Sequence, residues 1–432
     1  MNGEHALLKD LAQARGLRGL ASHLGPEQAL PPDVVERALD ALPDEGDRLV
    51  RALHGGDPAA RVVPFCGRRE ALEVIYNAVR DAVAQRRLHV VETAGERGLG
   101  KTRVLAEALA IIDPEARGID VLPVAVRPGD GPQAMMAQLV RRRFGILPRD
   151  SDQTAYDRII EAIEPLFDER TLVGNARLLG HLAGLRAMGP GADALPADLE
   201  TFRRHAFKAF VAVFRLDLAK APRILVLQQS DQLHERTLDT LVSLVVELAD
   251  EPLVLAVLNE GAAFELSDAV SSEHATFVRV QIEPLAERDV ERIAGSLFGD
   301  AGAEPELLRS LVEKARGNPR LVLENVRLLL QRGRLVVHEG IFARSPTGGV
   351  SSDGAEDLLG SDLDEASRLR IAALSVRERA LLQAAAIFGR AFEAEGALAI
   401  AAALEPQLGE GLAFERGLPV VVVAVVLHAE AV

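Results

Sequence analysis

Cysteine is almost absent from this chain of 432 residues, in which Cys66 stands alone. A single cysteine excludes an intrachain disulfide and any metal site built from clustered thiolates. The ten histidines are spread singly and show no spacing typical of metal ligands. Because nothing here calls for an oxidising compartment, the composition favours a cytoplasmic protein, and Cys66 is expected to be a small buried apolar residue.

Long apolar runs are also scarce. The run LPVVVVAVVL at residues 418–427 has roughly half the length that a membrane-spanning helix needs, so we interpret it as a strand or a frayed end. The N-terminal segment MNGEHALLKDLAQARG mixes charged and apolar residues and lacks the continuous apolar core of a signal peptide. We therefore expect neither export nor a membrane partner.

Positive charge is in short supply. With 49 Lys and Arg against 64 Asp and Glu, the formal net charge is -15, which gives no general positive field to attract a nucleic acid or an anionic membrane. The basic run RRR at residues 141–143 falls at the end of a predicted helix, where it complements the helix dipole. Lysine in particular is rare and occurs only at Lys9, Lys101, Lys208, Lys220 and Lys314.

What the chain does contain is a regular alternation of apolar strands and amphipathic helices. Strands that are apolar on both faces and alternate with helices indicate a parallel sheet covered on both sides, so we predict an α/β fold. The predicted strands are RRLHVVETA (86–94), GIDVLPVAVR (118–127), RILVLQQ (223–229), PLVLAVLN (252–259) and TFVRVQIEPL (276–285). A helix with a wide apolar face is predicted at 101–112 and another helix at 236–250. A long helical stretch spans about 132–220, with breaks predicted at ILPRDSD (146–152) and GPGADALP (189–196).

After residue 284 the pattern becomes helical. Three helices are predicted at 287–299, 304–317 and 319–333, and a second helical set begins near residue 374. Between them, residues 345–362 are rich in Gly, Ser and Asp and are expected to form a surface loop. The sequence therefore predicts a smaller helical unit after the sheet.

The sharpest motif is GERGLGKT, which fits the phosphate-loop pattern G-x-x-x-x-G-K-[ST] and lies between a predicted strand and a predicted helix. Glycines let successive backbone N–H groups face a phosphate chain, and the following helix adds its positive dipole end. Lys101 would reach the β and γ phosphates, and the Thr102 hydroxyl would ligate Mg²⁺. The predicted nucleotide-binding residues of this loop are Gly95, Glu96, Arg97, Gly98, Leu99, Gly100, Lys101 and Thr102.

Four elements follow one another along about residues 62–405, namely VPFCGRREAL, GERGLGKTRVLAEAL, ARGNPRLVLENVRLLLQRGRL and LSVRERALLQAAAIFGRAF. In this order they resemble the STAND-type regulatory ATPases, AAA+-like P-loop modules of bacterial signalling and transcription regulators. The resemblance implies a P-loop sheet followed by an all-α lid and a partial winged helix. It also places Arg68 and Pro319 near the base of the nucleotide, although a surface arginine and a simple helix start are the alternatives.

The pattern and the resemblance together predict the following division of the chain: an N-terminal helical segment of unknown role (1–60), the P-loop domain (61–284), the lid (285–335), the winged-helix-like domain (336–405) and an atypical tail (406–432). The sensor repeats usual in the family are missing after the winged helix, so a truncated product is one interpretation.

Around the phosphate site the sequence departs from the family pattern. The strand before residue 236 normally ends in two acidic residues, and these positions hold Gln228 and Gln229. The first acid usually holds hydrated Mg²⁺ and the second orients the attacking water, so neutral glutamines would preserve binding better than hydrolysis. The next strand ends in Glu260 where the family commonly has an arginine, and this carboxylate is either a surrogate acid or a solvated loop residue.

The sequence therefore predicts a protein that binds ATP or ADP, with Mg²⁺ held weakly and hydrolysis impaired or absent. By the resemblance, it would act as a nucleotide-responsive switch or scaffold with a protein partner or by self-association. One alternative is an active ATPase that uses Glu260. Another is a DNA-binding transcriptional regulator that uses the winged helix, although the acidic balance makes nucleic acid an unlikely partner.

Overall fold

The computed structural model describes two compact units, one formed by residues 68–283 and the other by residues 63–67 and those from Pro284 onwards. Each unit is considered by itself. The described residues are 63–114, 116–125, 131–147, 150–186, 199–228, 233–260, 266, 270, 272–298, 304–338, 341–344, 359–374, 379, 382 and 383. The predicted segments 1–60 and 406–432 lie outside them, as do Gln229 and most of the predicted winged helix.

The first unit contains a five-stranded sheet, and its strands match the five predicted apolar segments. The strands are β1 (His89–Ala94), β2 (Asp120–Ala125), β3 (Arg223–Gln228), β4 (Leu253–Asn259) and β5 (Thr276–Gln281). The helices are α5 (Arg69–Gln85), α6 (Lys101–Ile112), α7 (Pro132–Arg143), α8 (Asp152–Ile163), α9 (Glu169–Leu182), α10 (Leu199–Lys220) and α11 (Glu235–Glu247), with a short 3-10 turn, η1 (Glu164–Leu166).

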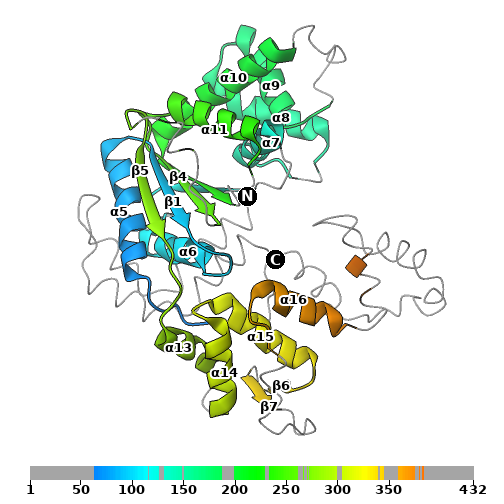
Figure 1. The fold of residues 1–432 in the computed structure, drawn as a ribbon. Helices are drawn as coiled ribbons and strands as arrows, with labels where there is room; N and C mark the ends of the chain where they lie inside the picture. The colour runs from blue at the N-terminus through cyan, green and yellow to red at the C-terminus, as the bar shows by residue number, and fades with distance from the viewer. Residues whose placement is uncertain are drawn as a thin grey trace, which may run out of the picture. The chain divides into compact units, whose positions relative to one another are not determined.

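All strands of this sheet run parallel, in the order β2-β3-β4-β1-β5. Every residue of β1 and β4 is buried, as expected for central strands covered on both faces (Figure 1). The register aligns Gln228 of β3 with Leu258 of β4, and Leu258 with Thr93 of β1. The carboxyl ends of these three strands therefore meet at one edge of the sheet, and the predicted α/β fold is confirmed.

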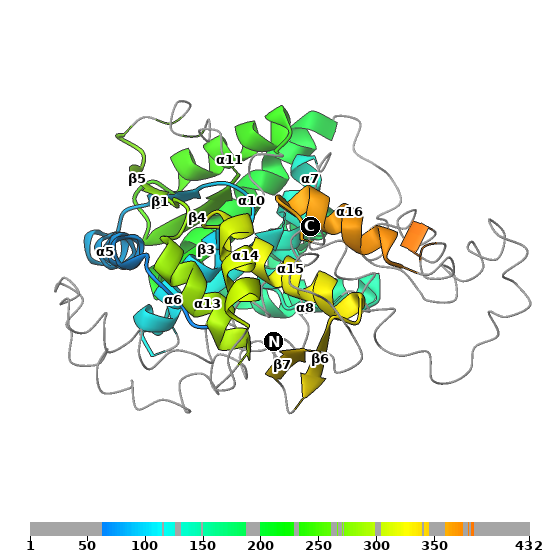
Figure 2. The same ribbon diagram turned by 60° about the horizontal axis from the view of Figure 1, so that its bottom comes forward.

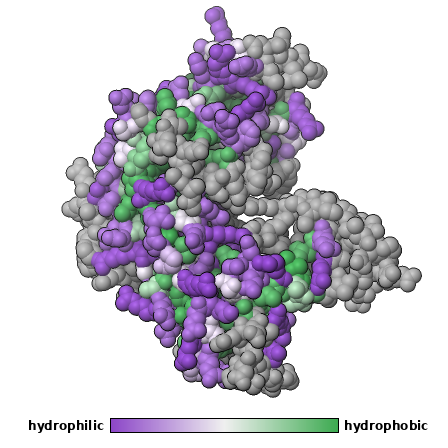
Figure 3. Space-filling view, viewed as in Figure 1, coloured by the Kyte–Doolittle hydropathy of each residue, from purple (hydrophilic) through white to green (hydrophobic). Residues whose placement is uncertain are grey.

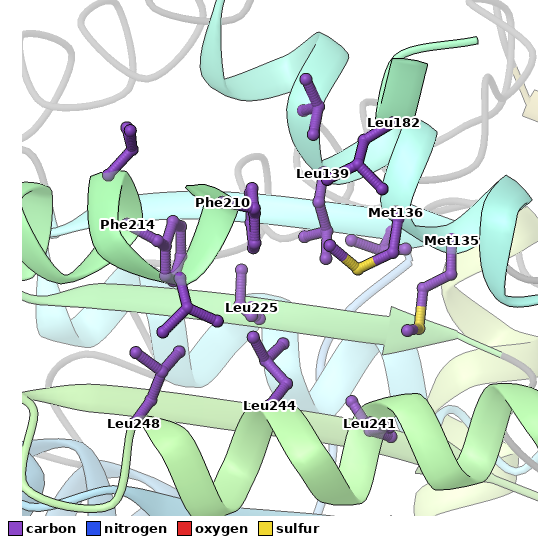
Figure 4. Close-up of a cluster of buried hydrophobic side chains, with 14 of the residues drawn as sticks. Met135, Met136, Leu139, Leu182, Phe210, Phe214, Leu225, Leu241, Leu244 and Leu248 are labelled. Atoms are coloured by element: carbon purple, nitrogen blue, oxygen red, sulfur yellow. The ribbon is translucent and has the colours of Figure 1, made fainter. Parts of the chain in front are cut away.

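Two sets of helices cover the sheet. Helix α5 packs against β1, β4, β5 and α6, whereas α7 to α11 gather on the opposite side (Figure 1). On that opposite side the core brings Leu225 of β3 against Phe210 and Phe214 of α10 and Leu244 of α11 (Figure 4). Because strand side chains alternate between faces, Gln228 lies on the face opposite to Leu225 and Leu227, which is the face of α5 and α6.

The long helical stretch predicted at 132–220 is divided more often than its sequence pattern suggested. Besides the predicted breaks, α8 ends at Ile163, a 3-10 turn follows, and Asp168 caps α9 by accepting a hydrogen bond from the Thr171 N–H at 2.9 Å. Pro165 in that turn ends one helix and the Asp168 N-cap starts the next. The apolar periodicity reveals neither of these signals.

The second unit is mostly helical and also carries a short hairpin. Its elements are α13 (Glu287–Phe298), α14 (Pro305–Ala315), α15 (Pro319–Gln331), β6 (Leu335–His338), β7 (Ile341–Arg344) and α16 (Leu363–Ala372). The antiparallel hairpin β6–β7 follows directly on α15 (Figure 2). Its strands and α16 were not predicted from the apolar periodicity. Cys66 is buried in this unit, and burial raises the pKa of its thiol, which argues against a nucleophile.

Polar side chains buried in the second unit join α15 to α16. Asn325 donates to the Gly360 carbonyl at 3.0 Å and accepts from the Gly360 N–H at 2.8 Å. The Glu324 carboxylate is surrounded by guanidinium groups, with Arg327 at 3.0 Å, Arg320 at 3.9 Å and Arg370 of α16 bound to its other oxygen. Burial by itself raises the pKa of this carboxyl, but the arginines outweigh burial and hold the pKa below its usual value.

The Glu324→Gln variant should lower the free energy of unfolding by roughly 3 kcal/mol, because it leaves three arginines without their shared anion. This is the lower end of the range for a broken buried pair, since the Arg327 and Arg320 side chains are 31% and 29% exposed. The folded pKa is lowered, so the stabilisation is present above the unfolded pKa and is lost as pH falls through the folded value.

Thermal unfolding followed by circular dichroism checks this expectation, with Glu313→Gln on the exposed face of α14 as the matched control. The difference in unfolding temperature between the parent and Glu324→Gln should become smaller in acid. The Glu313→Gln control should unfold at the parent's temperature at every pH. Equal unfolding temperatures of the parent and Glu324→Gln at neutral pH would show that the ion pairs of Glu324 do not stabilise the unit.

The helices and the exposed side chains of the described residues bear on the question of a membrane segment. No helix within the described residues is long and apolar enough to cross a bilayer. In the space-filling view, hydrophilic side chains cover most of the described face (Figure 3). The exposed large apolar residues are Val74, Val173, Leu216, Val246 and Ile371, which belong to five different helices. Single apolar residues of this kind are ordinary on a protein surface.

Candidate functional site: a phosphate loop with a neutral strand end

The predicted phosphate loop joins the buried strand β1 to α6, so the motif has the strand–loop–helix context that it requires. Gly98 and Gly100 adopt positive φ angles of 84° and 92°. These are left-handed backbone conformations that glycine adopts without strain, and they curl the chain at the start of the helix. Gly100 is the N-cap of α6 and makes no side-chain cap hydrogen bond, which leaves the positive end of the helix open to an anion.

Gly95 is required for another reason, namely the close approach of a neighbouring strand. A Cβ atom built there would lie 2.6 Å from the carbonyl oxygen of Ile282, just beyond β5. The backbone N–H of Gly95 donates to the Asn259 carbonyl at 3.3 Å, and the Ile282 N–H donates to the Ala94 carbonyl at 2.7 Å. The first residue of the loop is thus fixed between the ends of β4 and β5.

Arg68 reaches the other side of the loop. It is the N-cap of α5 in a left-handed conformation with φ 64°, and its Nη2 donates to the Leu99 carbonyl at 3.0 Å. A non-glycine residue pays a conformational penalty at such an angle, so the surrounding contacts hold it there. Arg68 therefore supports the loop through the Leu99 backbone. Its predicted place beside the base is a separate expectation that stays a prediction.

Replacing Arg68 with alanine should weaken nucleotide binding by about tenfold, because the loop loses one charged hydrogen bond that fixes its shape. Arg68→Lys should lose less affinity than Arg68→Ala, since a lysine ammonium can also donate a hydrogen bond to the Leu99 carbonyl. Titration with a fluorescent ATP analogue checks both variants against Arg69→Ala, a neighbouring residue that pairs with Glu73 on the surface of α5. Parent-like affinity in Arg68→Ala would contradict a supporting role.

Lys101 is the first residue of α6, and its side chain turns back to the start of the loop. It is only 8% exposed, and its Nζ donates to the carbonyl oxygens of Gly95 at 2.8 Å and Glu96 at 2.9 Å. Glu260, which directly follows β4, places its Oε1 3.9 Å from the same Nζ. The structure therefore brings the predicted surrogate carboxylate next to the predicted phosphate-binding lysine. Thr102 follows as a half-buried residue of the first turn of α6, and its role as a Mg²⁺ ligand stays a prediction.

Gln228 ends β3, at the strand position where the family pattern puts the first acid. It lies two strands away from β1 in the same row as Thr93, about 10 Å across the sheet from that residue. Its Nε2 is buried and finds no hydrogen-bond partner among the described residues. A carboxylate would present two acceptor oxygens and a negative charge here, whereas the amide presents one acceptor and a donor.

The residues fit a phosphate group better than they fit a metal ion. The glycine conformations, the open N-terminus of α6 and the buried ammonium of Lys101 are the chemistry that recognises phosphate. For Mg²⁺, oxygen ligands with negative charge are preferred, and within the described part of the chain no cluster of three or more His, Cys, Asp or Glu side chains could hold a metal. Thr102 would be the remaining protein ligand.

Asn259 and Glu92 form a hydrogen-bonded pair beside the loop, and this contact was not predicted. Asn259, the last residue of β4, is 1% exposed, and its Nδ2 donates to Oε1 of the buried Glu92 of β1 at 3.1 Å. Arg279 of β5 lies 3.7 Å from the other Glu92 oxygen. The backbone carbonyl of Asn259 accepts a hydrogen bond from the Gly95 N–H, so this pair links β1, β4 and the edge strand β5 to the loop. The sequence feature that could have indicated this pair is Glu92, a charged residue inside an otherwise apolar strand.

Pro319 belongs to the second unit, whereas the residues of the phosphate loop belong to the first. It occupies the first position of α15, and Asn318 caps that helix by accepting hydrogen bonds from the N–H groups of Arg320 and Leu321 at 3.1 and 3.3 Å. The helix-start interpretation of Pro319 therefore holds. Whether Pro319 also meets the nucleotide base stays a prediction.

Comparison with known proteins gives structural similarity only. No protein-family model matches the chain, and no curated protein matches it in sequence. The Cdc6p protein of Pyrobaculum aerophilum is 13% identical with a TM-score of 0.40, covering 83% of this chain and 84% of that one. The Orc1 protein of Aeropyrum pernix, solved in complex with DNA, is 15% identical with a TM-score of 0.40, covering 83% and 82%.

A signal transduction ATPase with numerous domains from Pyrococcus horikoshii, which carries a tetratricopeptide repeat sensor, is 14% identical with a TM-score of 0.42. The match covers 84% of this chain and 39% of that one. At these scores we draw no functional conclusion from the similarities. The expectation that nucleic acid is not a partner stays a prediction. The α/β unit built on a phosphate loop is what the chain's own geometry establishes.

Proposed function

We propose that this protein binds ATP or ADP at the loop of residues 95–102 and hydrolyses ATP slowly or not at all, acting as a nucleotide-responsive switch or scaffold. One observation carries the proposal: a buried lysine follows a glycine loop, while β3, two strands away from β1 in the same sheet, ends in a neutral amide. Binding and cleavage have different requirements, and the site retains those of binding.

The loop residues would hold the phosphates in the following way. Backbone N–H groups of the loop and of the first turn of α6 would donate to phosphate oxygens, with the positive helix end adding to the attraction. Lys101 would exchange its bonds with the Gly95 and Glu96 carbonyls for charged bonds to the phosphates. Mg²⁺, when bound, would neutralise phosphate charge, with the Thr102 hydroxyl as its protein ligand.

Hydrolysis would be impaired because Gln228 carries neither a negative charge nor a basic site. A glutamine oxygen can accept a hydrogen bond from a metal-bound water, but it cannot take up a proton from an attacking water. The same holds for Gln229, which lies outside the described residues. Loss of a general base alone lowers a rate by roughly 10²- to 10⁴-fold.

A switch role would follow from the two bonding states of Lys101. In one state its ammonium bonds to carbonyls of its own loop, and in the other it would bond to a ligand, so nucleotide binding would change the loop that Arg68 supports. Such a switch needs a difference in affinity between two arrangements rather than fast turnover. The readout would be a protein partner or a second copy of the chain.

Equilibrium titration of the full chain with a fluorescent ATP analogue, followed by displacement with unlabelled ATP and ADP, tests the proposal. We expect saturable binding at micromolar or lower concentrations that either nucleotide reverses. Phosphate release from the same sample should stay close to the rate without protein. Failure of both nucleotides to displace the probe would remove the basis for a nucleotide-binding function.

A second candidate is a working ATPase, and the contact between Glu260 and Lys101 at 3.9 Å is the observation that favours it. The carboxylate lies near where the phosphates would bind and could orient a water there. In that case the parent protein would release phosphate steadily with Mg²⁺, and Glu260→Gln would abolish the release. Background turnover in both proteins would reject this candidate.

A further inference from the structure

Glu260 puts a negative charge at the place where a polyphosphate needs positive charge. The residue follows the last position of β4, the strand that lies between β1 and β3, and its carboxylate is paired with the ammonium of Lys101. The Glu260 side chain is 38% exposed, whereas that of Lys101 is 9% exposed. Lys101 is therefore the buried partner of the pair and Glu260 the more exposed one. Because Glu260 directly follows β4, its backbone is held at the strand end, and its carboxylate stays near the ammonium when a ligand arrives.

We propose that Glu260 is a specificity-determining residue that makes the site favour a nucleoside diphosphate over a nucleoside triphosphate. This inference rests on the proposed nucleotide-binding function and adds the charge selectivity of the site. A ligand has to replace the carboxylate as the counter-ion of Lys101, and its terminal phosphates then stand beside a like charge. Each additional phosphate raises that repulsion.

The neutral end of β3 strengthens the effect. In a site with an acid at position 228, a firmly held Mg²⁺ would offset the charge of the third phosphate. Gln228 is neutral and holds Mg²⁺ more weakly than an acid would. The metal therefore offsets less of the repulsion between the Glu260 carboxylate and the third phosphate. Because the carboxylate is partly exposed, solvent and salt reduce the interaction, and the expected selectivity is modest rather than absolute.

Removing the charge without changing the size of the side chain gives the decisive comparison. In Glu260→Gln, affinity for ATP should rise by about tenfold and affinity for ADP by about threefold, both measured by displacement of a fluorescent analogue without Mg²⁺. Glu260→Ala should show the same direction. In the parent, raising the salt concentration should narrow the preference for ADP, because salt screens the exposed carboxylate.

Glu161→Gln, an exposed position on α8, is the matched control and should keep the parent ratio of the two affinities. Circular dichroism confirms that each variant is folded. A parent that binds both nucleotides, with an unchanged ratio in Glu260→Gln, would overturn the selectivity and leave the proposed function standing. Weaker binding of ATP with Mg²⁺ in Glu260→Gln would also overturn it, since the carboxylate would then be a metal ligand. A parent that binds neither nucleotide would overturn both.

Discussion

Replacing Lys101 with alanine should lower the affinity for ATP and ADP by about 100-fold or more. The ammonium makes two hydrogen bonds within the loop and would make charged bonds to the β and γ phosphates in their place. Each such bond contributes about 1.5–3 kcal/mol, so the loss of two corresponds to at least a factor of about 100. Displacement of a fluorescent ATP analogue measures the change.

Lys220→Ala is the matched control for this variant, because that lysine is exposed at the end of α10. It should bind nucleotide like the parent. Lys101→Ala also leaves two loop carbonyls without their donor, so its thermal unfolding has to be recorded beside its affinity. A folded Lys101→Ala protein with parent-like affinity would mean that the loop does not grip phosphates in the way described.

The second large effect is a gain of activity. Restoring both acids, as Gln228→Asp with Gln229→Glu, should raise the rate of phosphate release from ATP at least about 100-fold over the parent. The carboxylate at 228 would give Mg²⁺ a charged partner on the face of the sheet that carries α6, and the one at 229 would supply the base. Steady-state phosphate release with and without Mg²⁺ measures the gain, which should depend on the metal.

Gln228→Asn is the control, since it shortens the side chain as Asp does but adds no charge. Its phosphate release should remain at the parent level. If the double acidic variant binds ATP, is folded and still shows no turnover, then the neutral strand end is not what limits hydrolysis, and another part of the machinery must be missing.

Much of the fold could be predicted from the chain because its pattern is local. The five strands are short apolar segments, and α6 begins at Lys101 and ends at Ile112, the span that its apolar face indicated. The phosphate loop could be found because its glycines and lysine occur at fixed spacing between a strand and a helix. Helix α5 was missed as an element, although its buried face repeats at helical spacing through Leu72, Ile75 and Val79.

The contacts around the loop could not be predicted because they depend on strand order. Glu260 meets Lys101, and Asn259 meets Glu92, only because β4 inserts between β1 and β3 in the sheet. Sequence gives the strands but not their lateral order. Arg68 and Leu99 are likewise 31 positions apart, and their contact follows from the packing of α5 beside the loop. The contacts of the site that join residues distant in the sequence therefore depend on the topology of the fold.

The most direct test recovers the nucleotide itself. The full chain is incubated with ATP and Mg²⁺, separated from free nucleotide, and denatured, and the released nucleotide is identified by chromatography. If the loop grips a triphosphate beside a strand end that cannot promote its cleavage, most of the recovered nucleotide will still be ATP. Recovery of ADP with matching phosphate release, lost in Glu260→Gln, would contradict that account.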